Sequence, residues 1–366
     1  MNDKTDRLLR KNGLPYAIPV SRWHRHLFER TAPVVLAITL STLMLFVSIS
    51  IFERIHDLPD ELFLFVFFAI SAVTLVAPIV AATWLWGYFS HRMRHIVSAM
   101  TYLSFIGVSS VFSQWIFDSK PPLTVLDTLP YSFAVILLLM ALEWAGITPM
   151  LLWAAKTASR ELNTIWAVAG KVLPIILMIV VFAYFSAEAW QITDRLTGSH
   201  ISMLAGFMSI FALATSIGIA KSEFSGISED SSSILAKASS TIRTINIYFV
   251  IVMTQLIQAA IFFGLFTALL ITIGQIALTE HTISSWLTHP SHFYTIIGTS
   301  IKLPISSNMV HTAAFIATFA TLSFMMSAAN DKQYRGLLFD PIFDRIKTTI
   351  TRASQDKSTD KSRRTQ

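Results

Sequence analysis

Glu143 is the residue whose surroundings most suggest chemistry, because its carboxyl group lies inside a long apolar run, residues 130–153. A charge in hydrocarbon is costly unless it is paired or neutralised, so an ionisable residue in such a run is a functional candidate by default. Gly146 and Pro149 follow in the same run. Proline donates no backbone hydrogen bond and displaces the carbonyl four residues earlier, that of Ala145. The sequence therefore predicts a kink and a freed backbone oxygen beside Glu143.

Two further candidates, Lys171 and Pro174, lie where the next apolar run, residues 172–190, begins. If the two runs are neighbouring helices, Glu143 and Lys171 meet in the same half of the membrane. One interpretation is a proton- or cation-coupled site at broken helices, as in many transporters. The other is structural, with Glu143 paired to Lys171 or held as a neutral acid between helices. We favour the structural interpretation, because no second deep acid or histidine forms a relay with Glu143.

Three secondary polar candidates lie on later segments. Gln255 and Gln258, three residues apart, mark one polar face of a long apolar run. Amides at this spacing are typical of hydrogen bonds between membrane helices, and a substrate contact is the alternative. Glu188 with Trp190 closes the run 172–190, which is typical of an anchor at the membrane surface. A role at the mouth of a substrate path is the alternative for this pair.

Motifs of other chemistries are missing from the sequence. It contains no GxxxxGK[ST] phosphate loop, no HExxH, no GxSxG and no GxGxxG, and it has no cysteine. His289 and His292 have the spacing of metal ligands, but Pro290 lies between them and no third ligand is evident. We therefore expect no enzyme activity, no metal and no cofactor.

The amino-acid composition indicates whether these residues are surrounded by water or by lipid. Charged residues make up 14% of the 366 residues and hydrophobic residues 53%, whereas soluble globular chains are roughly 25% charged. A helix needs roughly 20 apolar residues to cross a bilayer. Eight runs meet that length, and the prediction is an all-α, polytopic transmembrane helix bundle. The predicted spans, within a membrane domain of residues 32–330, are 32–52, 62–87, 96–117, 130–153, 172–190, 201–220, 245–278 and 305–329.

The distribution of basic residues predicts the orientation. With both termini in the cytoplasm, 24 of the 28 Lys and Arg residues lie on the inner side, which agrees with the positive-inside rule. Residues 1–31 then form a basic cytoplasmic segment. The net charge of +6 is explained by this topology, so we expect no nucleic-acid partner. The run 245–278 is long for one span, and residues 286–301 after it fit an outer loop, an interfacial helix or a re-entrant piece.

The C-terminal part predicts a helix lying along the inner membrane surface. Asp340 and Pro341 are typical of a helix start, and apolar residues then recur at helical spacing. Residues 331–353 are therefore expected to form an amphipathic helix that binds anionic lipid at the inner face or packs on the protein itself. Residues 354–366 have the composition of a disordered tail.

A resemblance supplements this pattern. The stretches Lys171-Val-Leu-Pro174, Phe185-Ser-Ala-Glu188-Ala-Trp190-Gln191 and Asp331-Lys-Gln-Tyr334-Arg335, together with the helix carrying Gln255 and Gln258, resemble multi-pass integral membrane proteins of actinobacteria. The likeness covers the second half of the chain. It implies a bacterial plasma-membrane location and supplies no catalytic residue.

Two functions remain open at this point. The first is a transporter of a small solute linked to protons or cations, with Glu143 as the coupling residue. The second is a non-catalytic scaffold or assembly partner in envelope biogenesis, which would bind another membrane protein or a second copy of the chain. The long inner tail and the scarcity of deep charge support the second function.

Overall fold

The structure, a computed structural model, describes residues 3–18, 20–90, 93–117, 124–160, 178, 181–196, 198–230, 241–289, 292–295, 302–330 and 348. The described chain is almost entirely helical, as predicted. Six of its helices are long and apolar enough to cross a membrane, which fits a multi-pass membrane protein. The six stretches are Leu27–Ile55, Leu62–Tyr88, Arg94–Trp115, Val125–Trp144, Tyr248–Ala277 and Ser307–Met326.

The chain divides into two compact units. The α2–α5 unit consists of Ser21–Ala145 and His292–Ser306. The α6–α12 unit consists of Met1–Val20, Gly146–Ser291 and Ser307–Gln366. Each unit is described by itself below.

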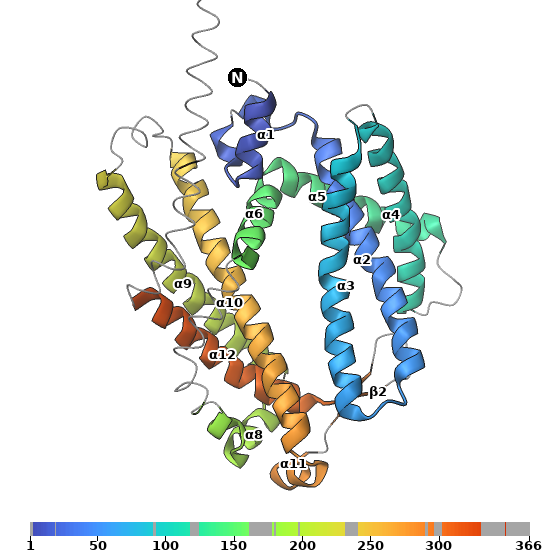
Figure 1. Cartoon of the computed structure of the whole chain (residues 1–366), viewed down its shortest axis with the longest axis vertical. Helices are drawn as coiled ribbons and strands as arrows, with labels where there is room; N and C mark the ends of the chain where they lie inside the picture. The colour runs from blue at the N-terminus through green and yellow to red at the C-terminus, as the bar shows by residue number, and fades with distance from the viewer. Residues whose placement is uncertain are drawn as a thin grey trace, which may run out of the picture. The chain divides into compact units, whose positions relative to one another are not determined.

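Four long helices make up most of the α2–α5 unit, and in Figure 1 they run beside one another in shades of blue and teal. Helix α2 packs against the other three, and α4 also packs against α5. Their core contains Ala32 and Val35 of α2, Tyr102 of α4 and Ile136 of α5. The elements of this unit are α2 (Leu27–Ile55), α3 (Asp60–Tyr88), α4 (Arg94–Phe117), α5 (Val125–Trp144), β1 (Phe293–Thr295) and β2 (Lys302–Ser306), preceded by the 3-10 turn η2 (Val20–Arg22).

Helix α10 is the centre of the α6–α12 unit, since α6, α9 and α12 all pack against it. Helix α12 also contacts α8 and α9, and α1 contacts α6. Residues Ala313 and Ala317 of α12 are fully buried, so this stripe of small residues is an internal packing seam. The elements of this unit are α1 (Asp3–Lys11), η1 (Pro15–Ala17), α6 (Ile147–Arg160), α8 (Ala187–Asp194), α9 (Gly198–Asp230), α10 (Thr241–Ala277), α11 (Glu280–Trp286) and α12 (Ser307–Asn330).

The predicted single span 130–153 is wrong, because two helices replace it. Helix α5 ends at Trp144, and α6 begins at Ile147. Gly146 between them has φ +76°, the left-handed conformation with which glycine commonly ends a helix. A Cβ at this position would lie 2.8 Å from Cγ of Pro15, so the close approach also requires glycine. Pro149 therefore lies in the first turn of α6, where a missing N–H costs nothing. It does not kink a continuous helix.

One other predicted span also differs from the structure. The described end of the run 172–190 is interrupted at Ser186, whose hydroxyl accepts a hydrogen bond from the N–H of Ala189 at 3.3 Å and starts α8. The run 201–220 lies inside α9, of which the described residues supply the apolar stretch Gly206–Gly218. The described residues therefore provide six candidate spans where the sequence predicted eight. The predicted positions of the two termini remain predictions.

The segment 245–302 is described except for residues 290–291 and 296–301. Helix α10 continues through Gly264 without a break and is 37 residues long. The described residues after it form α11 and strand β1, which pairs antiparallel with β2. The predicted interfacial helix of residues 331–353 and the tail 354–366 lie outside the described residues, apart from Thr348.

Candidate functional site

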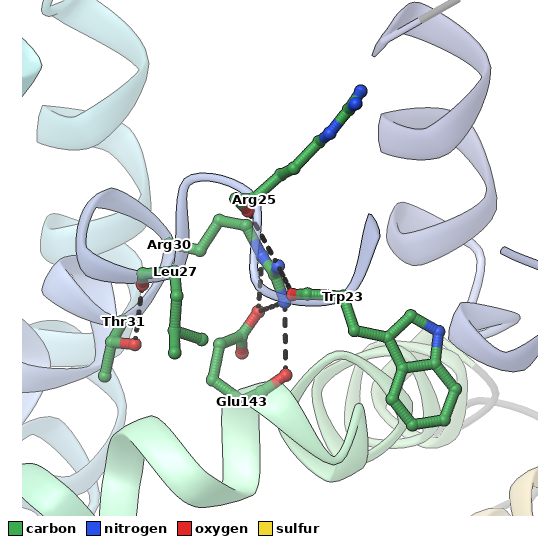
Figure 2. A network of polar contacts seen from close by, with 6 residues as sticks. All are labelled: Trp23, Arg25, Leu27, Arg30, Thr31 and Glu143. Carbon is green, nitrogen blue, oxygen red and sulfur yellow. Dashed lines mark hydrogen bonds and ion pairs between the residues drawn. The ribbon is translucent and has the colours of Figure 1, made fainter. Parts of the chain in front are cut away.

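Glu143 lies in the last turn of α5 and forms an ion pair with Arg30 from the first turn of α2 (Figure 2). The Arg30 Nη2 and Nε groups both donate to Oε1 of Glu143, at 2.7 and 3.0 Å. The residue Glu143 is only 6% exposed. Helix α5 has 20 residues, which at 1.5 Å each is about 30 Å, the thickness of the hydrocarbon core. Glu143 is therefore at the end of a full-length span and not in its middle.

The guanidinium of Arg30 makes three further hydrogen bonds, all to backbone carbonyls. Its Nη2 donates to the carbonyl of Glu143 at 3.1 Å, and its Nη1 donates to those of Trp23 and Arg25 at 3.0 and 3.1 Å. In Figure 2 the guanidinium lies between the chain that precedes α2 and the end of α5, whereas the side chain of Arg25 points away. A cation at a helix C-terminus is also favoured by the helix dipole. Arg30 thus ties the approach to α2 to the end of α5.

This pairing has a direct chemical consequence for Glu143. An arginine stays protonated in proteins, so its charge cannot be released to suit the carboxylate. If Glu143 took up a proton, the mostly buried guanidinium would lose its counter-charge, and breaking such a pair typically costs about 3–5 kcal/mol. The arrangement therefore favours a permanent ion pair over a carboxyl group that exchanges protons.

A second buried acid, Glu29, neighbours Arg30 on α2. Its Oε1 lies 2.7 Å from Nε2 of His95 at the start of α4, and its Oε2 lies 3.8 Å from Nδ1 of His26. His95 is largely exposed, while Glu29 is buried. His26, the residue before α2, has φ +54°, a left-handed conformation that is uncommon for residues other than glycine. The start of α2 therefore carries two acid–base contacts at successive positions, an ion pair at Arg30 and a contact at Glu29 that is ionic only when His95 is protonated.

Neither Arg30 nor the Glu29 cluster was a candidate from the sequence. Arg30 is two residues before the predicted span 32–52 and belongs to the predicted basic N-terminal segment. Its partner is 113 residues away along the chain. The only indication in the sequence of a partner for Glu143 is that a buried acid needs a cation, and several basic residues meet that requirement equally well.

The structure does not test a contact between the remaining predicted candidates and this network. Lys171 and Pro174 lie outside the described residues, so a contact between Glu143 and Lys171 stays a prediction. Pro149, Glu188, Gln255 and Gln258 belong to the α6–α12 unit, whereas Glu143 belongs to the α2–α5 unit.

The two glutamines of α10 are both buried, as expected for residues inside a helix bundle. Among the described residues, however, neither amide atom of Gln255 has a hydrogen-bond partner. The predicted hydrogen bond from Gln255 to a neighbouring helix is therefore not formed with any described residue.

Glu188 is exposed on α8, but its neighbour Trp190 is fully buried. The indole N–H of Trp190 donates to the carbonyl of Tyr184 at 2.7 Å. The prediction that Trp190 anchors the chain at a membrane surface is wrong, because the indole is part of the protein core.

A polar network around Asp194, the last residue of α8, organises the described part of the same unit. Its Oδ2 accepts from the backbone N–H of Thr288 at 3.0 Å and of His289 at 3.3 Å, and it lies 3.1 Å from Nδ1 of His289. Its Oδ1 accepts from the side-chain amide of Asn308 at 2.8 Å. Burial opposes the charged form, but these hydrogen bonds outweigh it and hold the pKa of Asp194 below its ordinary value.

The histidines considered for metal binding do not form a site in the described chain. His289 is bound to Asp194, and the described residues contain no group of three or more His, Cys, Asp or Glu side chains that could hold a metal ion. The carboxylate of Asp194 is better explained as a junction between α8, the segment after α11 and the start of α12.

Comparisons with known proteins do not extend this picture. No protein-family model, no curated protein and no solved structure matches the chain. Function must therefore be inferred from the geometry above.

Proposed function

We propose that this chain is a non-catalytic scaffold or assembly partner in a bacterial plasma membrane. The observation that carries the proposal is the Arg30–Glu143 pair. The most conspicuous ionisable group in the apolar runs is held by a permanent cation through two hydrogen bonds, with little exposure to solvent. Such a carboxylate stabilises a fixed arrangement of helices, which is what a scaffold needs.

The same contacts argue against the alternative, transport linked to protons or cations with Glu143 as the coupling residue. A coupling carboxylate must bind and release its ion during each cycle, and the guanidinium opposes both protonation and cation binding. That alternative remains a prediction, and its test closes the Discussion.

The lipid-facing surface of a scaffold would be supplied by the exposed apolar side chains of the α2–α5 unit. Helix α3 exposes Phe65 and Leu75, helix α4 exposes Leu103, and helix α5 exposes Leu126 and Tyr131, each by more than two thirds of its surface. Because α2 is covered by these three helices, we assign the contact with lipid to α3, α4 and α5. The partner is another membrane protein or a second copy of the chain.

The exposed Arg25 before α2 fits an inner membrane surface with anionic lipids. The two acids nearest to it in the network, Glu29 and Glu143, are buried and contact His95 and Arg30. A juxtamembrane Lys or Arg gains roughly 1 kcal/mol near an anionic surface. This supports the proposed cytoplasmic side of the segment before α2.

The proposal is tested by the size of the native assembly. The full chain is extracted from its own membrane in mild detergent, and its mass is measured beside that of a variant lacking residues 331–366. We expect the full chain in a stoichiometric complex and the shortened chain, equally well inserted, as a monomer. A full chain that is monomeric under every mild condition would contradict the scaffold function.

A further inference from the structure

Four buried polar atoms on two neighbouring helices of the α6–α12 unit have no hydrogen-bond partner within the described chain. Three of them are Oε1 and Nε2 of Gln255 on α10 and Oγ of Ser216 on α9, and the fourth is Oγ1 of Thr267 on α10. Gln255 is 5% exposed and Ser216 is fully buried. An unsatisfied buried polar group costs about 1–3 kcal/mol, so each one requires an explanation. A bound molecule that supplies the missing hydrogen bonds is such an explanation.

The register of the two helices places Gln255 and Ser216 at the same level. Helices α9 and α10 pack against each other and run in opposite directions, shown in olive and orange in Figure 1. Ser216 is 14 residues before the end of α9 at Asp230, and Gln255 is 14 residues after the start of α10 at Thr241. At 1.5 Å per residue both lie about 21 Å from the joined ends.

Helices α9, α10 and α12 pack pairwise, and both residues lie on covered faces of their helices. Gln255 precedes Phe262 by seven residues, which is about two turns, so the two share a face of α10. Phe262 stacks on Phe324 of α12 with ring centroids 4.5 Å apart. On α9, Ser216 belongs to the covered stripe, which the partly buried Met208 and Ala212 continue at four-residue spacing.

We propose that Gln255 and Ser216 form a binding site for a small uncharged molecule that both donates and accepts hydrogen bonds, either water or a solute with hydroxyl or amide groups. The carboxamide offers one acceptor and two donors, and the hydroxyl offers both functions. The described buried side chains of α9, α10 and α12 include no charged residue, so the site has nothing with which to neutralise an ion. The site goes beyond the scaffold function and does not depend on it.

The lack of cysteine in the chain allows a direct test. Single variants Gln255→Cys and Ser216→Cys are labelled with N-ethylmaleimide in liposomes, beside Leu270→Cys at a fully buried apolar position of α10. Only the thiolate form of cysteine reacts with N-ethylmaleimide. An apolar environment raises the pKa of a thiol, and each unit of that rise lowers the thiolate fraction about tenfold. We expect the thiols at positions 255 and 216 to react at least about tenfold faster than the thiol at position 270. Equal, slow labelling at all three positions would overturn the proposal.

Competition then distinguishes the two sources of the ligand. If glycerol or acetamide slows labelling at positions 255 and 216 but not at a solvent-exposed control, Asp57→Cys, the site takes a solute with hydroxyl or amide groups. If labelling is fast and neither compound slows it, the bound molecule is water. Both outcomes support the site and differ only in its occupant.

A second measurement covers the case in which the cysteine variants do not fold. In Gln255→Leu an apolar side chain of similar length replaces the amide. If the amide is bonded to a molecule, this variant lowers the midpoint of thermal unfolding. If the amide is dry and unpartnered, the same variant leaves the midpoint unchanged or raises it, which would overturn the proposal.

Discussion

A single residue at the start of α2, Arg30, connects this helix to the end of α5 within the α2–α5 unit. The guanidinium of Arg30 donates to the carboxylate and carbonyl of Glu143 and to two carbonyls before α2. These bonds are charge-assisted, and such bonds are roughly twice as strong as neutral ones. The loss of either charge leaves the other one buried and uncompensated, so the two residues should behave as a unit.

We therefore expect Glu143→Gln to lower the free energy of unfolding by about 3 kcal/mol or more, because the Arg30 charge would remain without its counter-charge. The measurement is the midpoint of thermal unfolding of the purified chain in detergent. The matched control is Glu53→Gln, since Glu53 is an exposed acid at the other end of α2, and it should change the midpoint little. Equal effects of the two variants would contradict the structural role of Glu143.

Asp194 provides a prediction with a defined pH range. Its pKa is held below the ordinary value of 3.8, so its contribution to stability is complete above that pH and is lost as the pH falls through the lowered pKa. Asp194→Asn should be less stable than the wild type at pH 7 and should lose less stability below pH 4. The measurement is the unfolding midpoint against pH.

The control for Asp194 is Glu188→Gln, because Glu188 is an exposed acid on the same short helix. The profile of this control should follow the wild type. An Asp194→Asn profile parallel to the wild type would show that the carboxylate does not contribute through its charge.

At the scale of elements, the break between α5 and α6 is the feature that most changes the interpretation of the sequence. Gly146 ends α5 with a positive φ, and Pro149 is then harmless in the first turn of α6. The break gives α5 a length that matches one membrane thickness and places Glu143 at its end. It also brings the glycine against Pro15 of η1.

Gly146→Ala should therefore lower the free energy of unfolding by more than about 1–2 kcal/mol, the cost of the left-handed conformation alone, because its Cβ would also clash with Pro15. The control is Gly107→Ala inside α4, where a Cβ meets nothing within 4 Å. Alanine is favoured over glycine in a helix interior by about 0.5–1 kcal/mol, so this control should be stabilised. Chemical denaturation of both variants checks the prediction, which fails if they shift stability in the same direction.

The long apolar helices could be predicted from the sequence, because hydropathy over some twenty residues is a property of each segment alone. Helices α2, α3, α4 and α9 each contain a predicted span, and α10 and α12 each contain theirs except for at most two residues at one end. The break at Gly146 could not be predicted, because proline six residues after Glu143 suggested a kink and the contact with Pro15 is far away in sequence. The partner of Glu143 was missed for the same reason, since 113 residues separate it from Arg30.

At the scale of the whole molecule, the predicted orientation in the membrane can be tested without removing native thiols. The basic segment before α2 is expected in the cytoplasm, and the turn between α2 and α3 is expected outside. Arg25→Cys and Asp57→Cys place single thiols at exposed positions on either side of α2. A membrane-impermeant thiol reagent added to intact cells should label only the second variant. Labelling of the Arg25→Cys variant before permeabilisation would show that the orientation is the reverse of the predicted one.

The central claim is that Glu143 holds helices together and does not couple transport. The most direct test is proton flux into proteoliposomes that contain the wild type or Glu143→Gln in equal folded amounts, with protein-free liposomes as the baseline. A structural role predicts that both chains give the baseline flux while Glu143→Gln is less stable. A flux above baseline in the wild type that Glu143→Gln abolishes, with folded protein unchanged, would contradict the claim.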